Sequence, residues 1–251
     1  MKNQVALVTG GAGYIGGAII DKLAENGAKI AFFDINAEAC EKKIVELRNR
    51  GVDCESYVVD LTDYTAVCKQ VEAVISKFGK IDILVPCAGG SARKEIRRFA
   101  EQKIDVLHRV IDMNLYGTLH VLHAVVPYMI KANRGKIVCI GSLVGMGCVP
   151  GCLDYGCAKA GVISMVRSLA VELGPYNINV NSVSPGKVPR PDEVPTDVYS
   201  FTKRFQVINH MLTGRDVAEV VAFLASSAAD AITGQNYPVC GGRSVGLRGD
   251  Y

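Results

Sequence analysis

The sequence predicts an α/β fold, a doubly wound parallel sheet in a single domain over residues 1–251. Short apolar runs alternate along it with segments of helical spacing, as in chains where each strand is followed by a crossover helix. A glycine-rich turn directly follows the first run, and an acidic residue ends the second. The chain has 251 residues, 49% of them hydrophobic, which is enough for one large core.

The predicted strands are rich in Val and Ile, and most are apolar on both faces, which is typical of strands buried in a parallel sheet. They cover residues 5–9, 29–33, 56–59, 81–86, 136–140 and 179–183, with a short last strand at 236–239. The predicted helices cover residues 14–26, 37–50, 63–78, 101–131, 155–173 and 216–226. Four glycines stand near helix ends, where a left-handed residue can stop a helix: Gly27, Gly51, Gly79 and Gly174.

One segment breaks this alternation. The stretch from Pro185 to Gly214 is long, carries four prolines and joins a strand to the last helix. Loops of that length in compact domains are usually functional or mobile. We therefore expect a substrate lid over residues 186–214.

Composition excludes several classes of protein. The net charge is +3 and no basic stripe runs along the chain, which argues against nucleic-acid binding. Neither a signal peptide nor a membrane-spanning run is recognisable, so we expect a cytoplasmic protein. The nine cysteines are expected to be free thiols. Cys148, Cys152 and Cys157 fit no zinc-ligand spacing, and no metal site is expected.

The glycine-rich turn predicts a dinucleotide site. Gly10, Gly13 and Gly16 open the first helix in the run Thr9-Gly10-Gly11-Ala12-Gly13-Tyr14-Ile15-Gly16. Glycines there allow the main chain to approach a pyrophosphate at the positive end of the helix. Asp34, followed by Ile35, is placed to accept hydrogen bonds from an adenosine ribose and to repel the 2′-phosphate of NADP. The alternative is that Asp34 only caps the next helix. NAD is the favoured cofactor.

A second motif carries catalytic chemistry. Tyr155 and Lys159 lie four residues apart at the start of a predicted helix and so share one face. A nearby ammonium favours phenolate and lowers the pKa of a tyrosine, which makes it a usable acid or base near neutral pH. Ser142 follows the fifth strand, and Asn114 lies in the long predicted helix.

Together these motifs make the chain similar to the short-chain dehydrogenase/reductase family over essentially its whole length. The shared features are the glycine turn, Asp60-Leu61, Ala88-Gly89, Asn114, Ser142, Tyr155, Lys159, the run Asn181-Ser182-Val183-Ser184-Pro185-Gly186, and the tail motifs Ile232-Thr233-Gly234-Gln235 and Gly241-Gly242. The resemblance implies that Tyr155 exchanges a proton with the substrate oxygen and that Ser142 hydrogen-bonds it. It also implies that Lys159 lowers the pKa of Tyr155 and binds the nicotinamide ribose, and that Asn114 supports a water chain behind Lys159.

The resemblance also implies the cofactor contacts. These residues are Gly10, Gly13, Tyr14, Ile15, Gly16, Asp34, Ile35, Asp60, Leu61, Cys87, Ala88, Gly89, Tyr155, Lys159, Pro185, Gly186 and Val188. Three positions depart from the family pattern. Tyr14 stands where single-domain members usually carry glycine, Pro86-Cys87 replaces a pair of asparagines, and Arg190 replaces a threonine that often contacts the carboxamide.

The expected function is hydride transfer between NAD(H) and the CH–OH or ketone group of a small secondary alcohol. The alternative is an NADP-linked 3-oxoacyl-type ketoreductase. A non-catalytic dinucleotide sensor would not need Ser142, Tyr155 and Lys159 together. Lys187, Arg190, Lys203 and Arg204 hint at an anionic substrate, against the alternative of a solvated loop. The helices at 101–131 and 155–173 carry more apolar residues than a one-sided surface helix needs. Members of the family that the chain resembles often pair these helices across two-fold axes as dimers or tetramers, so the resemblance implies an oligomer, and we expect a homotetramer.

Overall fold

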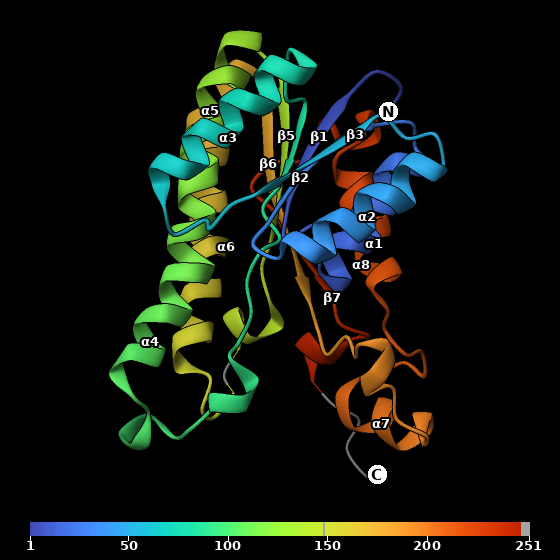
Figure 1. Ribbon diagram of the computed structural model, residues 1–251. Helices are drawn as coiled ribbons and strands as arrows, with labels where there is room; N and C mark the ends of the chain where they lie inside the picture. Colours follow the sequence, from blue (N-terminus) through green and yellow to red (C-terminus); the bar gives the residue numbers. More distant parts are fainter. Residues whose placement is uncertain (148, 247–251) are drawn as a thin grey trace.

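The computed structural model, which describes residues 1–147 and 149–246, contains one parallel sheet with the strand order β3-β2-β1-β4-β5-β6-β7 (Figure 1). The strands are β1 (Val5–Thr9), β2 (Lys29–Asp34), β3 (Cys54–Val58), β4 (Ile83–Val85), β5 (Gly135–Ile140), β6 (Ile178–Pro185) and β7 (Asn236–Val239). All seven lie within two residues of the strands predicted from the sequence. The predicted doubly wound α/β fold is confirmed.

Helices cover both faces of the sheet (Figure 1). On one face lie α1 (Tyr14–Glu25), α2 (Ala37–Asn49) and α8 (Gly214–Leu224); on the other lie α3 (Tyr64–Phe78), α4 (Ile104–Ile111), α5 (Gly117–Ala132) and α6 (Leu153–Leu173). Each face has its own apolar core, and the neighbouring, fully buried Phe32 and Phe33 belong to different cores. Successive strand residues point to opposite faces, so a strand buried on both sides is apolar throughout.

The order of the strands reverses beside β1. This strand pairs with β2 on one side and with β4 on the other. In open α/β sheets, ligands bind in the crevice outside the carboxyl ends of the strands at such a point. The glycine-rich turn after β1 and residues 86–89 after β4 both begin at this edge of the sheet.

The single helix predicted over residues 101–131 is wrong. The segment begins with a 3-10 turn (Phe99–Glu101), continues as α4, passes through a π-helical turn at Asp112–Tyr116 and ends as α5. A π turn widens the helix by one residue per turn, which sequence periodicity cannot reveal over so short a stretch. Asn114 lies inside this turn, so the departure from regular helix falls on a candidate site residue.

The predicted helix stops are confirmed at three of four glycines. Gly27, Gly51 and Gly79 adopt φ values of 86°, 74° and 78°. Gly174 does not, because its φ is −53° and it starts a 3-10 turn, Gly174–Tyr176, that extends α6. Asn177, with φ 55°, supplies the left-handed residue instead. Asparagine tolerates that conformation better than most side chains.

The predicted lid has structure of its own. It contains a 3-10 turn (Pro191–Glu193) and α7 (Val198–Phe205), which begins where the Asp197 side chain accepts a hydrogen bond from the Ser200 N–H at 3.0 Å. Further 3-10 turns lie at Arg93–Glu95, Leu143–Gly145, Ser227–Ala229 and Arg243–Val245. Across the described part of the chain, no helix has the length and apolar character needed to cross a membrane.

Candidate active site

The glycine-rich turn packs directly against the end of β4. Gly10 has φ 66°, and a Cβ on it would lie 2.8 Å from the Cα of Ala88. A Cβ on Gly16 would collide with the Gly10 carbonyl. Gly13 is the N-cap of α1, and the half-buried Ile15 packs against the core. The turn and the first turn of α1 therefore form a tight cradle that exposes main-chain N–H groups at the helix start.

Thr9, a residue that sequence analysis did not single out, joins the two segments. Its hydroxyl oxygen accepts hydrogen bonds from the N–H groups of Cys87 (3.0 Å) and Ala88 (3.1 Å). Thr9 is buried at the end of β1, beside the glycines. A threonine ending an otherwise apolar strand was the available signal, because a buried hydroxyl needs a partner.

Asp34 lies at the carboxyl end of β2, next to the glycine-rich turn. Its carboxylate accepts hydrogen bonds from the N–H groups of Ala12 and Asn36, each at 3.1 Å. The N-cap of α2 is Asn36, whose side chain accepts from the Ala39 N–H at 3.0 Å. The alternative that Asp34 caps this helix is therefore wrong. Ile35 is 67% exposed beside it.

Asp60 and Leu61 follow β3 at the same edge of the sheet. The Asp60 carboxylate accepts from the N–H and the hydroxyl of Thr62, at 2.9 and 2.8 Å. Leu61 is buried, and its carbonyl accepts a hydrogen bond from Nδ1 of His120 at 2.8 Å. A carbonyl can only accept, so neutral His120 carries its proton on Nδ1. These bonds fix the main chain after β3 in one conformation.

Asn114 holds the loop after β4. Its side-chain oxygen accepts from the Gly90 N–H at 3.0 Å, and its amide nitrogen donates to the carbonyls of Gly90 (2.9 Å) and Val110 (2.8 Å). Gly89, with φ 147°, has no room for a Cβ, which would collide with the Asn114 side chain and lie 3.4 Å from Nζ of Lys159. The loop after β4 is thus packed between Asn114 and Lys159.

Three of the candidate catalytic residues lie around the end of β5. Ser142 is buried, and its hydroxyl oxygen accepts from the Val144 N–H at 3.1 Å. Tyr155 and Lys159 lie on α6, where Nζ of Lys159 is 5.8 Å from the centroid of the Tyr155 ring. Nζ of Lys159 donates to the carbonyl of Ile140 at 3.0 Å.

Burial dominates the electrostatics of this cluster. It lowers the pKa of Lys159 from its ordinary value of 10.5 to about 8. It also raises the pKa values of the nearby thiols Cys87 and Cys139 to about 12. Both thiols are therefore neutral at pH 7, and the lysine is the charged group of the pocket.

The lid begins at the end of β6. Pro185 is the last residue of this strand, and the Gly186 N–H donates to the Val239 carbonyl at 2.9 Å. A Cβ on Gly186 would lie 3.0 Å from Cys240, and Val188 is buried. Arg190 is exposed, and Lys203 and Arg204 lie on the exposed side of α7. Arg190, Lys203 and Arg204 thus face solvent, whereas the half-buried Lys187 forms an ion pair with Glu193 at 3.9 Å.

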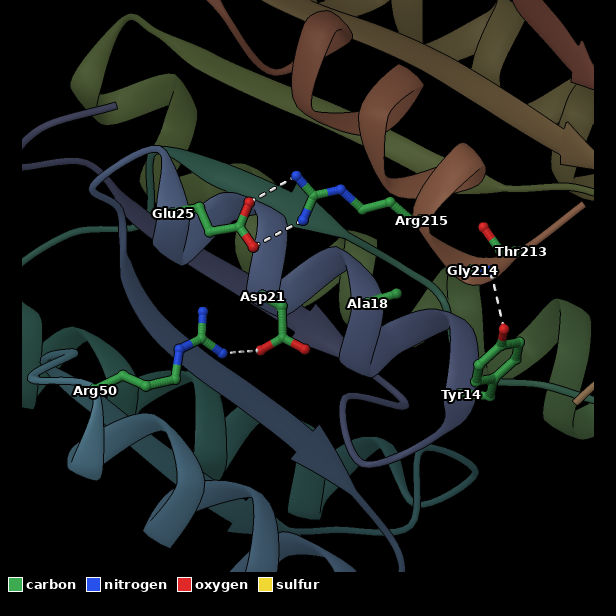
Figure 2. Close-up of a pocket in the computed structure, with 8 residues that line it drawn as sticks. All are labelled: Tyr14, Ala18, Asp21, Glu25, Arg50, Thr213, Gly214 and Arg215. Carbon is green, nitrogen blue, oxygen red and sulfur yellow. Dashed lines mark hydrogen bonds and ion pairs between the residues drawn. The ribbon is translucent and has the colours of Figure 1, made fainter. Parts of the chain in front are cut away.

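Tyr14 turns toward the far end of the lid. Its hydroxyl accepts a hydrogen bond from the Gly214 N–H at 3.4 Å, which links the start of α1 to the start of α8 (Figure 2). The cavity drawn there measures about 370 Å³ and also contains two ion pairs, Arg215 with Glu25 and Arg50 with Asp21. Its charged groups are paired with each other, and it contains none of the candidate catalytic residues.

No metal site or disulfide is found where the structure describes the chain. No group of three or more His, Cys, Asp or Glu side chains within that part could hold a metal ion. Eight cysteines there are free thiols. Cys148, one of the three cysteines considered above, lies outside the described residues.

Comparisons with known proteins fit this geometry. A family model described as Enoyl-(Acyl carrier protein) reductase matches residues 10–244. The chain is 37% identical to (2S)-[(R)-hydroxy(phenyl)methyl]succinyl-CoA dehydrogenase subunit BbsD of Thauera aromatica over 98% of both chains. It is 36% identical to 3-oxoacyl-[acyl-carrier-protein] reductase FabG of Thermotoga maritima, over 96% of this chain and 98% of that protein.

A solved structure extends the comparison to three dimensions. The NAD+-bound xylitol dehydrogenase superposes with a TM-score of 0.87 at 34% identity, over 96% of this chain and 99% of that one. The range matched by the family model includes the glycine-rich turn from Gly10, the Ser142–Lys159 segment and residues 186–214. The chain therefore belongs to the short-chain dehydrogenase/reductase family of nicotinamide-dependent oxidoreductases.

Proposed function

We propose that this oxidoreductase transfers a hydride between NAD(H) and the CH–OH or ketone carbon of a small secondary alcohol. The observation that supports it best is the meeting of three groups at the carboxyl edge of the sheet. Ser142, Tyr155 and the buried Lys159 lie at the end of β5, and Lys159 contacts the loop packed against the glycine-rich turn. A binding module would need the turn but not this group of residues.

Tyr155 is the proposed acid and base. At pH 7 a lysine whose pKa is about 8 is mostly charged, in roughly a tenfold excess over the neutral form. This ammonium, 5.8 Å from the centre of the Tyr155 ring, favours the phenolate and so makes proton release from the phenol easier. Tyr155 then takes the hydroxyl proton of an alcohol, or returns it to a ketone oxygen.

Ser142 is the proposed anchor for the substrate oxygen. Its oxygen already accepts from the Val144 N–H, which leaves the hydroxyl proton free to be donated. Asn114 is proposed to act indirectly, as a positioning residue. Its side-chain hydrogen bonds to Gly90 and Val110 hold the loop after β4 and the π turn in place. Support of a water chain behind Lys159 would then come from its main chain.

The residues at the carboxyl edge fit a dinucleotide. Gly10, Gly16 and Gly89 allow the close packing that forms the cradle, because a Cβ on them would collide with Ala88, the Gly10 carbonyl and Asn114. The Asp34 carboxylate lies at the rim of this cradle beside Ala12. The proposed contacts are those implied by the family resemblance, from the glycine turn to Val188. When bound, the nicotinamide donates or accepts the hydride. This chain's residues position the two reacting carbons and exclude water.

NAD is proposed over NADP because of Asp34. The carboxylate would lie beside the 2′-phosphate of NADP, and like charges repel. The solved relative whose description names NAD+ supports this choice. The 3-oxoacyl-[acyl-carrier-protein] reductase relative supports the alternative, an NADP-linked 3-oxoacyl-type ketoreductase.

The substrate class is a small secondary alcohol, and an anionic one is compatible with the basic residues of the lid. One relative is described as acting on a succinyl-CoA derivative and another on 3-oxoacyl groups, both of them acyl thioesters. A homotetramer in the cytoplasm and one domain over residues 1–251 complete the proposal. Light scattering at micromolar concentration tests the assembly, and a monomeric mass would contradict it.

The experiment for the function measures initial rates with NAD, NADP and their reduced forms. The panel contains polyols, sugar acids, cyclic alcohols and 3-oxoacyl thioesters, each followed by the absorbance of the reduced nicotinamide. We expect alcohol oxidation with NAD, lost in Tyr155→Phe. Activity on 3-oxoacyl thioesters with NADPH alone would favour the alternative, and no turnover of any member would count against both.

A further inference from the structure

The lid contains a buried amide whose hydrogen bonds are missing. Gln206, the C-cap of α7, is 1% exposed. Neither Oε1 nor Nε2 of its side chain has a hydrogen-bond partner within the described residues. Buried polar groups are nearly always paired, so each unpaired one calls for an explanation.

The contacts around Gln206 explain why it is enclosed. Its side chain lies flat on Gly241, where a Cβ would be 2.9 Å from both Cβ and Oε1 of Gln206. The next two N–H groups, of Val207 and Ile208, donate to the Gly241 carbonyl at 2.7 and 3.1 Å. The end of the lid is thus fixed to the turn after β7 by its main chain, and the amide is enclosed as a result.

Thr202, in the same helix, is a buried polar residue whose hydroxyl has hydrogen-bond partners. It is equally buried, and its hydroxyl donates to the Tyr199 carbonyl at 3.0 Å and lies 2.9 Å from Oδ1 of Asn209. Leaving a buried amide unpaired destabilises a fold. The lid can therefore satisfy a buried polar group, and Gln206 is the exception.

Gln206 lies close to the proposed nicotinamide segment. Gly186 contacts Cys240, and Gln206 contacts Gly241, the next residue along that turn. Between residues 187 and 205 only Val188, Pro189 and Thr202 are buried, so few contacts oppose a small shift of this part of the lid, while the main chain after Gln206 stays bonded to Gly241. Such a shift would open the enclosure around the Gln206 side chain and let its amide reach a bound nicotinamide.

We propose that Gln206 is a binding residue for the carboxamide of the nicotinamide ring, a proposal that rests on the proposed function. A primary amide both donates and accepts, and so does a carboxamide, so the two groups satisfy each other. Arg190, where family members often have a threonine, is exposed, and its guanidinium can only donate. The amide of Gln206 offers both roles, and both of its polar atoms are buried without a partner.

The test measures binding without turnover. Dissociation constants of NADH and of ADP-ribose, which lacks the nicotinamide, are determined by calorimetry for the wild type and for Gln206→Met, a close apolar match. We expect NADH to bind about five- to tenfold more weakly to the variant, the effect of one or two neutral hydrogen bonds. ADP-ribose should bind equally to both proteins, and the melting temperature of the ligand-free variant should rise.

A second measurement changes the cofactor as well as the protein. The wild type should bind NADH several-fold more tightly than reduced 3-acetylpyridine adenine dinucleotide, which has no amide N–H to donate, and Gln206→Met should lose that preference. Thr202→Val is the matched control. It should lower the melting temperature and leave the ratio of the NADH and ADP-ribose constants unchanged.

Several results would overturn the proposal. An unchanged NADH constant in Gln206→Met would do so, as would an equal loss of ADP-ribose binding or a lower melting temperature of the ligand-free variant. Unchanged NADH binding with a raised KM for the alcohol would assign the amide to the substrate instead. A wild type that binds neither NADH nor ADP-ribose would overturn the proposed function and this proposal together.

Discussion

Buried polar side chains are hydrogen-bonded on one side of the active site, whereas the other side contains a buried side chain without a hydrogen-bond partner. Asn114, Ser142, Tyr155 and Lys159, here called the catalytic cluster, lie on or beside β5, the π turn and α6. Asn114, Ser142 and Lys159 are at most 7% exposed, and the side chain of each makes a hydrogen bond to a main-chain group. The lid is mostly exposed and encloses the unpaired amide of Gln206.

This difference in hydrogen bonding predicts that the catalytic cluster determines the rate of turnover and that the lid determines binding affinity. Groups fixed by the core are already oriented for reaction, so changing them should alter turnover more than affinity. We propose that groups in the lid, such as Gln206, gain hydrogen-bond partners only on binding, so changing them should alter affinity and selectivity. The predictions below test this division, beginning with the largest expected effect.

Tyr155→Phe removes the phenolic hydroxyl group and leaves the ring in place. We expect turnover to fall by about 10²–10⁴-fold, the usual contribution of a general acid or base. NADH affinity and the melting temperature should remain near those of the wild type. Steady-state kinetics with calorimetry as the control checks this, and retention of more than a tenth of the activity would remove Tyr155 from the mechanism.

Lys159→Met should abolish turnover and yet stabilise the fold. Burial lowers the pKa of Lys159 from 10.5 to about 8, so its charged form is disfavoured in the folded chain by about 3 kcal/mol. Loss of the hydrogen bond to Ile140 offsets about 1 kcal/mol of the gain. We expect the variant to be more stable than the wild type by about 2 kcal/mol at pH 7.

The sign of the pH dependence follows from that lowered pKa. Below pH 8 the lysine is charged in both states and its destabilisation is fully present. Between about pH 8 and 10.5 the unfolded chain binds more protons, so wild-type stability rises with pH and the advantage of the variant shrinks. Urea unfolding at several pH values measures it, with the exposed Lys29→Met as control. A difference that grows above pH 8 would contradict it.

Asp34→Ala should reduce the cofactor preference. We expect the wild type to favour NAD over NADP in kcat/KM by at least about 100-fold, which corresponds to about 2.7 kcal/mol. The variant should lose most of this preference and keep α2 intact, because Asn36 caps that helix. Initial rates with both nucleotides test it. Equal use of NAD and NADP by the wild type would favour the alternative function, an NADP-linked ketoreductase.

Much of the fold and of the candidate site could be predicted from the sequence. Strand and helix periodicity located all seven strands, because residues such as Phe32 and Phe33 are apolar wherever both faces are buried. The glycines after the first strand predicted the position of the tight turn, and the acidic residue that ends the second strand predicted that Asp34 lies beside it. Local pattern was sufficient to place these residues where a turn or a strand end requires a residue type at a fixed position.

The rest depended on contacts between distant segments. The π turn at Asn114 inserts one residue without changing composition, and Asn177 rather than Gly174 supplies the left-handed residue after α6. Thr9 and Gln206 look ordinary in the sequence. Their importance comes from Cys87 and Gly241, which lie 78 and 35 residues away along the chain and which only the folded structure brings near.

Tyr14→Phe should have the smallest effect, because Tyr14 lies at the seam between the two regions. The bond from the Gly214 N–H to its hydroxyl is long, 3.4 Å, and Gly214 is the first residue of α8, where an N–H has no partner within the helix. We expect the free energy of unfolding to fall by at most about 1 kcal/mol. NADH affinity should stay within about twofold, because neutral hydrogen bonds at this length contribute little. Tyr64→Phe, which removes a 2.6 Å bond to His123 far from the lid, is the matched control. A tenfold loss of NADH affinity in Tyr14→Phe alone would show that the hydroxyl itself binds the cofactor. The phenol would then belong to the dinucleotide cradle rather than to the anchor of the lid.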